Sequence, residues 1–93
     1  MPAFIVAEID VTDAKGYEPY KVMAQESIAR HGGKYIARGG KTVSLEGDKP
    51  NRVVILQFDT LAAAEKFYHS PDYQQAVVSR QKASKGRLYI VEG

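Results

Sequence analysis

An arginine before a double glycine is the residue of this chain best suited to bind an anion. Arg38 stands immediately before Gly39 and Gly40, and glycine lets the backbone come close to a ligand. The planar guanidinium can hold a carboxylate or an enolate through two parallel hydrogen bonds. Arg52 and Arg80 are weaker candidates for the same role. The alternative for all three arginines is a structural ion pair.

Two residues could serve as a catalytic base. Asp10 follows Phe4 and Val6 on the even positions of one apolar segment, and a carboxylate beside apolar side chains can have a raised pKa. His69 lies between two expected short helices, and as a base it needs a substrate proton within hydrogen-bond reach. The alternatives are a salt bridge between Asp10 and Arg38, and a histidine that only occupies a helix junction.

Four tyrosines could line a binding pocket with their hydroxyls directed inward: Tyr17, Tyr20, Tyr68 and Tyr73. We predict that Tyr20, Tyr68 and Tyr73 join Arg38 as ligand-binding residues. The alternative is that they belong to the core and that their hydroxyls reach water or backbone.

The composition excludes several classes of protein. The chain has 93 residues, no cysteine and a formal charge of +2, which excludes a disulfide scaffold and a cysteine nucleophile. His31 and His69 lack the close spacing of a metal site, and we expect neither a metal nor another cofactor. The longest apolar run, Ala3 to Ala7, is too short for a bilayer span and lacks the basic region and cleavage site of a secretion signal, which predicts a cytoplasmic location. The basic residues from Arg80 to Arg87 are typical of a helix end, so we expect no nucleic-acid partner.

The hydrophobic pattern predicts one α+β domain over residues 1–93, with the order β-α-β-β-α-β of a ferredoxin-like fold. The expected elements are a strand at 3–11, a helix at 14–30, strands at 34–38 and 42–46, a strand at 52–59, helices at 60–68 and from 70 to about 85, and a strand at 87–92. Pro19 leaves open whether the first helix is kinked or begins near Glu18. Right-handed crossovers place the first and third strands in the centre of the sheet.

Apolar residues on both faces of the segment Arg52–Asp59 indicate that the sheet has a partner. Val53 and Ile55 lie on one face, while Val54 and Leu56 lie on the other. Helices on one side cover only one face of such a sheet, and the other face would expose a large apolar patch. We therefore predict a homodimer through the uncovered face that buries at least ~1,000 Å².

These features resemble the bacterial family known as domain of unknown function 1330. The resemblance covers essentially the whole chain. The residues that carry it are Asp10, Asp13, Tyr20, Gly32-Gly33, Arg38-Gly39-Gly40, Gly47, Arg52, Ser70-Pro71-Asp72-Tyr73-Gln74, Arg80 and Val91-Glu92-Gly93. It implies a dimeric α+β barrel of ferredoxin-like subunits, similar to small antibiotic-biosynthesis-type monooxygenases, muconolactone isomerases and EthD-like proteins. The family has no settled activity.

Two classes of function remain open. The first is a cofactor-independent enzyme, monooxygenase-like or isomerase-like, that acts on a small organic acid or aromatic molecule. Asp10 or His69 would be its base, and Arg38 would stabilise an anion. The second is a non-catalytic dimer that binds a small molecule or serves as an interaction module. An apolar cavity that contains Arg38 favours an enzyme or a binding protein, whereas a filled core with these groups in salt bridges favours a structural role.

Overall fold

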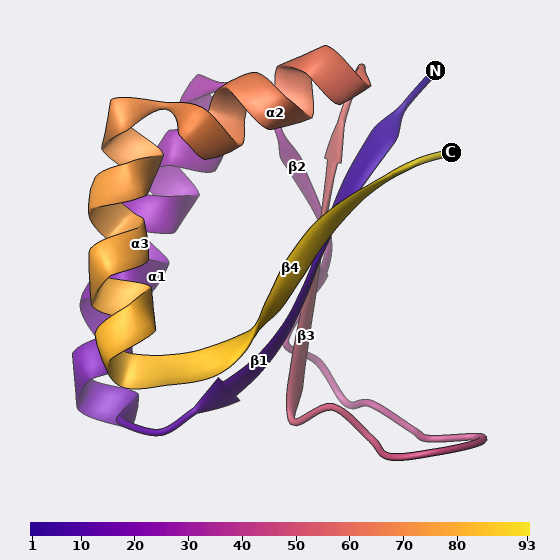
Figure 1. Ribbon diagram of the computed structural model, residues 1–93, viewed down its shortest axis with the longest axis vertical. Coiled ribbons are helices and arrows are strands. Elements are labelled where there is room, and N and C mark those ends of the chain that lie inside the picture. Colours follow the sequence, from indigo (N-terminus) through magenta and orange to yellow (C-terminus); the bar gives the residue numbers. More distant parts are fainter.

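The computed structural model describes residues 1–93 and contains a four-stranded sheet with helices on one face (Figure 1). The elements are β1 (Ala3–Val11), α1 (Ala14–Arg30), β2 (Lys34–Arg38), β3 (Arg52–Phe58), α2 (Leu61–His69), α3 (Pro71–Ala83) and β4 (Ser84–Glu92). The strands are antiparallel in the order β2-β3-β1-β4. This order confirms the predicted ferredoxin-like α+β fold and the central place of the first and third strands. No helix combines the length and the apolar character that a membrane crossing needs.

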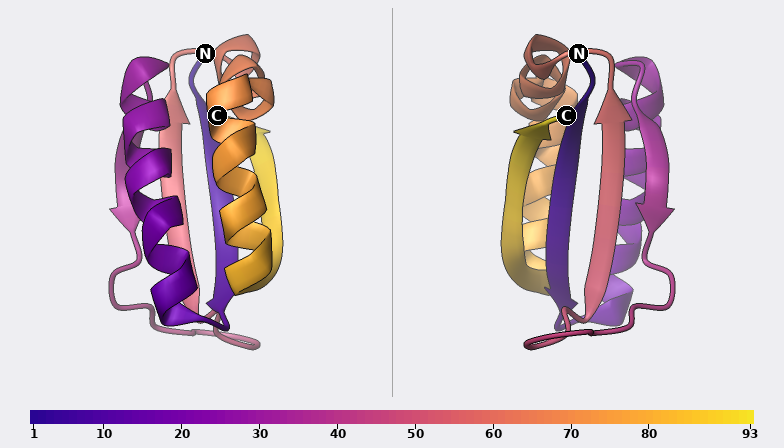
Figure 2. Two further views of the ribbon diagram at one scale, coloured as in Figure 1. Left: turned by 90° about the vertical axis from the view of Figure 1, so that its left-hand side faces the viewer. Right: turned by 90° about the vertical axis from the view of Figure 1, so that its right-hand side faces the viewer.

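The core lies between the helices and the inner face of the sheet. Helices α1 and α3 run side by side over this face, and α2 closes the space between the layers near the two termini (Figure 1 and Figure 2). Along β1, burial alternates so that Ala3, Ile5, Ala7 and Ile9 are buried under the helices. This period of two is what a strand with one covered face requires.

Helix α1 begins at Ala14 and runs through Pro19. The carboxylate of Asp13 accepts a hydrogen bond from the Gly16 backbone N–H at 3.1 Å, as an N-cap residue does. The alternative start near Glu18 is therefore wrong. Pro19 therefore lies inside the helix.

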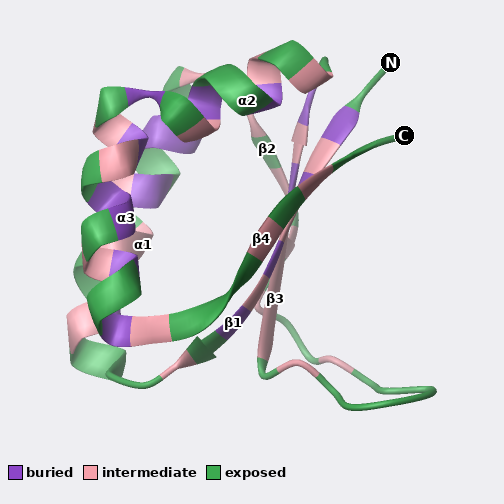
Figure 3. Cartoon of the chain, in the orientation of Figure 1, coloured by how far each residue is buried: buried purple, intermediate pink, exposed green.

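Two predictions about the strands are wrong: one expected strand does not form, and another begins earlier than expected. Residues 42–46 form no strand, because the chain leaves the sheet after β2 at Gly39, whose φ is +66°. Leu45 is 93% exposed, and the whole connection from β2 to β3 is largely exposed (Figure 3). The last strand begins at Ser84 and not at Arg87. Gly86 lies within it, where a Cβ atom would stand 3.0 Å from the Ile9 Cα, so this glycine permits close strand contact and does not end a helix.

The face of the sheet turned away from the helices is uncovered within the chain (Figure 2). We call it the open face, and its larger apolar side chains include those of Phe4, Val6, Val53, Ile55, Tyr89 and Val91. Tyr89 and Val91 are exposed, and the others are half-buried. The predicted division of β3 into two apolar faces is confirmed by the pairing of Ile55 with Val6 and of Val54 with Ala7.

Candidate functional site

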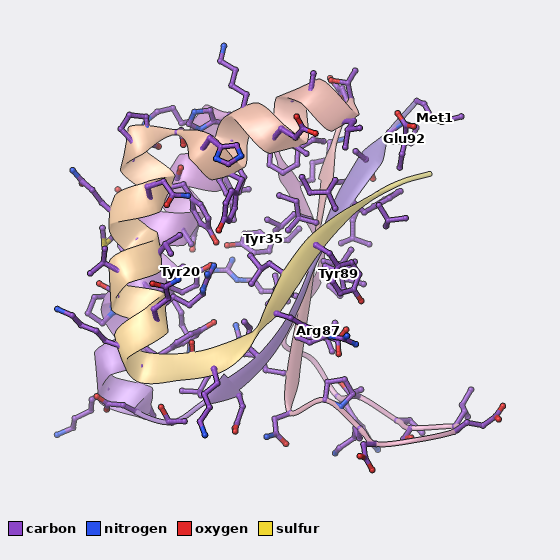
Figure 4. All side chains as sticks on the ribbon, in the orientation of Figure 1. Met1, Tyr20, Tyr35, Arg87, Tyr89 and Glu92 are labelled. Atoms are coloured by element: carbon purple, nitrogen blue, oxygen red, sulfur yellow. The ribbon has the colours of Figure 1, made fainter.

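A cavity of about 40 Å³ lies between the helices and the inner face of the sheet. We call it the interlayer cavity. Its wall is mostly apolar, and its three charged residues, Lys21, Arg38 and Arg52, are all cations. Tyr20 from α1 and Tyr35 from β2 extend into the space between the two layers (Figure 4). No aspartate, glutamate or histidine lines the cavity.

A β-bulge brings Arg38 into this site together with Tyr35. Tyr35 stands opposite Leu56 and Arg38 stands opposite Val54, with a register shift between them. In a regular strand, residues three apart lie on opposite faces, and one extra residue returns both to the inner face. The Arg38 Cζ then lies 4.2 Å from the centroid of the Tyr35 ring. Its Nη2 donates a hydrogen bond of 2.7 Å to the Gln25 Oε1.

Arg52 is the first residue of β3 and faces inward opposite Ile9. Its guanidinium packs against Gly39, where a Cβ atom would lie 2.6 Å from the Arg52 Cζ. The Cζ is also 5.8 Å from the centroid of the Tyr17 ring. The Arg52 Nε is buried and has no hydrogen-bond partner. Neither Arg52 nor Arg38 forms an ion pair with a carboxylate.

A short chain of hydrogen bonds crosses from α1 to α3 beside the cavity. The hydroxyls of Tyr20 and Tyr73 are 2.8 Å apart, and Arg80 Nη1 donates to the Tyr73 Oη at 3.1 Å. Burial raises the pKa of both phenols above their usual range, so both are neutral at neutral pH. Because the Tyr73 oxygen already accepts from Arg80, Tyr73 can donate its proton to Tyr20. The Tyr20 hydroxyl proton is then available to a third group.

An ion pair with hydrogen bonds fixes α1 against α3 and so fixes Tyr20 relative to Tyr73. Asp72 in the first turn of α3 accepts a hydrogen bond of 2.6 Å from the Ser27 Oγ and one of 2.7 Å from the Arg30 Nη1. The Ser27 hydroxyl, followed by further hydrogen bonds, holds the pKa of the Asp72 carboxyl well below its usual range.

The two predicted bases lie away from the cavity. Asp10 is exposed at the end of β1 and accepts a hydrogen bond of 2.9 Å from the Asn51 Nδ2. His69 is exposed at the end of α2. Arg38 and Asp10 do not pair with each other. A catalytic role for Asp10 or His69 therefore stays a prediction that the geometry of the cavity does not support.

Of the four predicted ligand-binding residues, the fold brings Arg38, Tyr20 and Tyr73 together at the cavity. Tyr68 packs against Tyr73, with ring centroids 5.8 Å apart, but it lines a neighbouring groove beside β4. Sequence reasoning missed Tyr35, because the bulge that brings Arg38 to the same face as Tyr35 has no recognisable signal in a five-residue strand.

Fold and cavity together define a small ferredoxin-like α+β protein with a site lined by tyrosines and cations. The chain belongs to the family described as Domain of unknown function (DUF1330), whose model matches residues 2–93. This match confirms the resemblance found in the sequence. No curated protein matches the chain significantly. No group of three or more histidine, cysteine, aspartate or glutamate residues is placed to hold a metal ion.

Several solved structures share the fold. RPA0582, a protein of unknown function from Rhodopseudomonas palustris, is 22% identical with a TM-score of 0.78, and the match covers 99% of this chain and 82% of that one. SnoaB, a cofactor-independent oxygenase from Streptomyces nogalater, is 16% identical with a TM-score of 0.69, over 99% and 92% of the two chains. A dimeric protein of unknown function from Bacteroides fragilis is 14% identical with a TM-score of 0.57, over 99% and 95%. At these identities the similarity shows the fold alone.

Proposed function

We propose that this chain binds a small organic acid or aromatic molecule at the interlayer cavity and acts on it as a cofactor-independent enzyme, of the monooxygenase or isomerase kind. One observation carries the proposal. The cations that line this apolar cavity include two arginines, Arg38 and Arg52, that have no carboxylate partner. Positive charge at an apolar wall is disfavoured unless an anion neutralises it, and the anion would be the ligand.

The chemistry that these residues can supply is the stabilisation of negative charge on oxygen. Arg38 and Arg52 provide fixed positive charge, and the neutral Tyr20 hydroxyl provides a hydrogen-bond donor. Groups preorganised in this way lower the energy of an enolate or a phenolate. Such an anion is the electron-rich species that an isomerisation or a reaction with molecular oxygen needs. The shared fold of the cofactor-independent oxygenase SnoaB is consistent with this proposal.

A non-catalytic binding protein is the second candidate, and the lack of a base favours it. A general base must reach the proton that it removes, directly or through one water. No carboxylate or imidazole lines the cavity. The enzyme proposal therefore requires a substrate acidic enough to enter as its anion, whereas the binding proposal requires nothing further.

We also propose that the chain is a homodimer through the open face. Tyr89 and Val91 are 44% and 49% exposed there, beside the half-buried Val53 and Ile55. A second copy would remove these apolar surfaces from water. The structural neighbour from Bacteroides fragilis is described as dimeric.

Native mass spectrometry of the freshly purified protein tests the ligand proposal, followed by thermal-shift measurements with a panel of organic acids and phenols. We expect a retained or stabilising anion and no stabilisation by neutral or cationic analogues of the same size. Oxygen uptake or product formation with that anion would then separate an enzyme from a binding protein. A panel in which no organic anion stabilises the fold would contradict both candidates.

A further inference from the structure

The arginine that the sequence favours for the anion is already engaged within the chain. Arg38 is exposed, stacks on Tyr35 at 4.2 Å and donates to Gln25 at 2.7 Å. These contacts hold the Arg38 guanidinium and the Tyr35 ring together at the edge of the sheet. This guanidinium therefore lacks the burial of a primary anion anchor, and its contacts suit it to position Tyr35.

Arg52 has the opposite properties. Its Nε–H is buried without a partner, and Arg52 lines the interlayer cavity. A buried donor without a partner is rare in folded proteins and calls for an explanation such as a bound ion. Gly39 leaves the space that the Arg52 guanidinium occupies, so the site is built around the position of Arg52.

Two further tyrosines line the same cavity. The cavity is lined by Tyr17, which is only 2% exposed, and by Tyr35. Neither hydroxyl takes part in a hydrogen bond with the rest of the chain. Burial is the main cause of a raised pKa at Tyr35, so its hydroxyl stays protonated. The Arg52 guanidinium can only donate hydrogen bonds, and the free Tyr17 and Tyr35 hydroxyls can each donate one, which suits an oxyanion ligand.

The size of the cavity limits the ligand. Its volume is about 40 Å³, whereas an apolar cavity that accepts benzene measures about 150 Å³. The available space corresponds to roughly three water-sized groups, and a carboxylate group has three heavy atoms. An aromatic ring does not fit inside the cavity without separation of the two layers.

The geometry points to Arg52, and not Arg38, as the residue that binds the charged group, and to a carboxylate of about two carbons as the ligand. This inference rests on the proposed function and names the ligand class of the same site. It selects the organic acid over the aromatic molecule, and it assigns Arg38 to the positioning of Tyr35.

The test follows the arginine Nε–H resonances by NMR while sodium acetate is added to the intact protein, with sodium chloride at equal ionic strength as the control. The chain has five arginines, so these resonances are few enough to assign by substitution. We expect the Arg52 Nε–H to shift saturably with acetate, with a dissociation constant on the order of 1 mM for so small a ligand. Benzoate at the same concentration should leave the chemical shift of the Arg52 Nε–H unchanged.

Matched substitutions complete the experiment. Arg52→Lys should weaken acetate binding about tenfold or more, because lysine loses the planar two-point geometry. Arg38→Lys should weaken it less than about threefold, since this residue acts through Tyr35. If Arg52→Lys does not fold, the shift of the Arg52 Nε–H resonance in the unmodified protein shows whether Arg52 binds acetate.

The outcomes distinguish the assignment of Arg52 as the anion anchor from the proposed function. If cavity amide resonances respond to acetate or benzoate but the Arg52 Nε–H does not, Arg52 is not the anchor and the proposed function stands. Tighter binding of benzoate than of acetate overturns the ligand class. If neither anion moves any cavity resonance, the proposed function fails as well.

Discussion

Removal of the Tyr73 hydroxyl should destabilise the protein about three times as much as removal of the Tyr20 hydroxyl. Tyr73 is 2% exposed and is the middle member of its chain, with Tyr20 at 2.8 Å and Arg80 at 3.1 Å. A neutral hydrogen bond contributes about 1 kcal/mol and one to a charged group about 2 kcal/mol. Tyr73→Phe loses both, or ~3 kcal/mol in total. Tyr20→Phe loses only the first, or ~1 kcal/mol.

Urea denaturation followed by circular dichroism measures these free energies of unfolding, at one protein concentration for all variants because a dimer would make stability depend on it. The double variant should be little worse than Tyr73→Phe alone, with a coupling of about 1 kcal/mol, because the bond between the two hydroxyls is already lost. Equal losses for the two single variants, or additive effects in the double variant, would refute the assignment of Tyr73 as the central member.

Three further changes test other parts of the structure. Gly39→Ala should lower the free energy of unfolding by ~1–2 kcal/mol, since φ is +66° there and the new methyl group meets an arginine guanidinium; an unchanged urea midpoint would contradict this. Ile55→Asp on the open face should convert a dimer to a monomer in sedimentation velocity, whereas Val78→Asp, on the exposed side of α3, should not. The pKa of Asp72 in the folded protein lies below its unfolded value, chiefly because of the Ser27 hydroxyl. The resulting stabilisation is complete above about pH 5 and is lost as the pH falls below about 4, so Asp72→Asn should flatten the acid limb of a stability–pH curve.

Local patterns were sufficient to predict most of the fold. The strand Ala3–Val11 and the helix that begins after Asp13 have the predicted bounds, because alternation and capping depend on residues close in sequence. The segment 42–46 alternates as a strand does, yet Leu45 is almost wholly exposed. Alternation alone cannot supply the neighbouring strand that a sheet needs, and the turn at Gly39 takes this segment away from it.

The site was harder to predict than the fold because it depends on how the strands pair with one another and not on residue types. The helical spacing of Tyr17 and Tyr20 correctly placed them on one face. Asp10 was expected near Arg38 from its position at a strand end, but β1 and β2 are separated by β3 in the sheet. Its side chain also lies on the even-numbered, open side of β1, opposite Lys85. A pairing between Asp10 and Arg38 would need both residues on one face of adjacent strands.

The spacing of Arg38, Gly39 and Arg52 acquires a single explanation once the registers are known. The bulge in β2 turns Arg38 inward over Tyr35, and the left-handed Gly39 that follows carries the chain away from the sheet. The space left by the missing Cβ of Gly39 is taken by the guanidinium of Arg52, which enters from the neighbouring strand. The sequence favours Gly39 as a place where a ligand approaches the backbone, but in the structure this glycine lets a second arginine approach the cavity. The positively charged end of the site is therefore assembled from two strands. A substitution at Arg38, Gly39 or Arg52 should change the conformation of the other two residues.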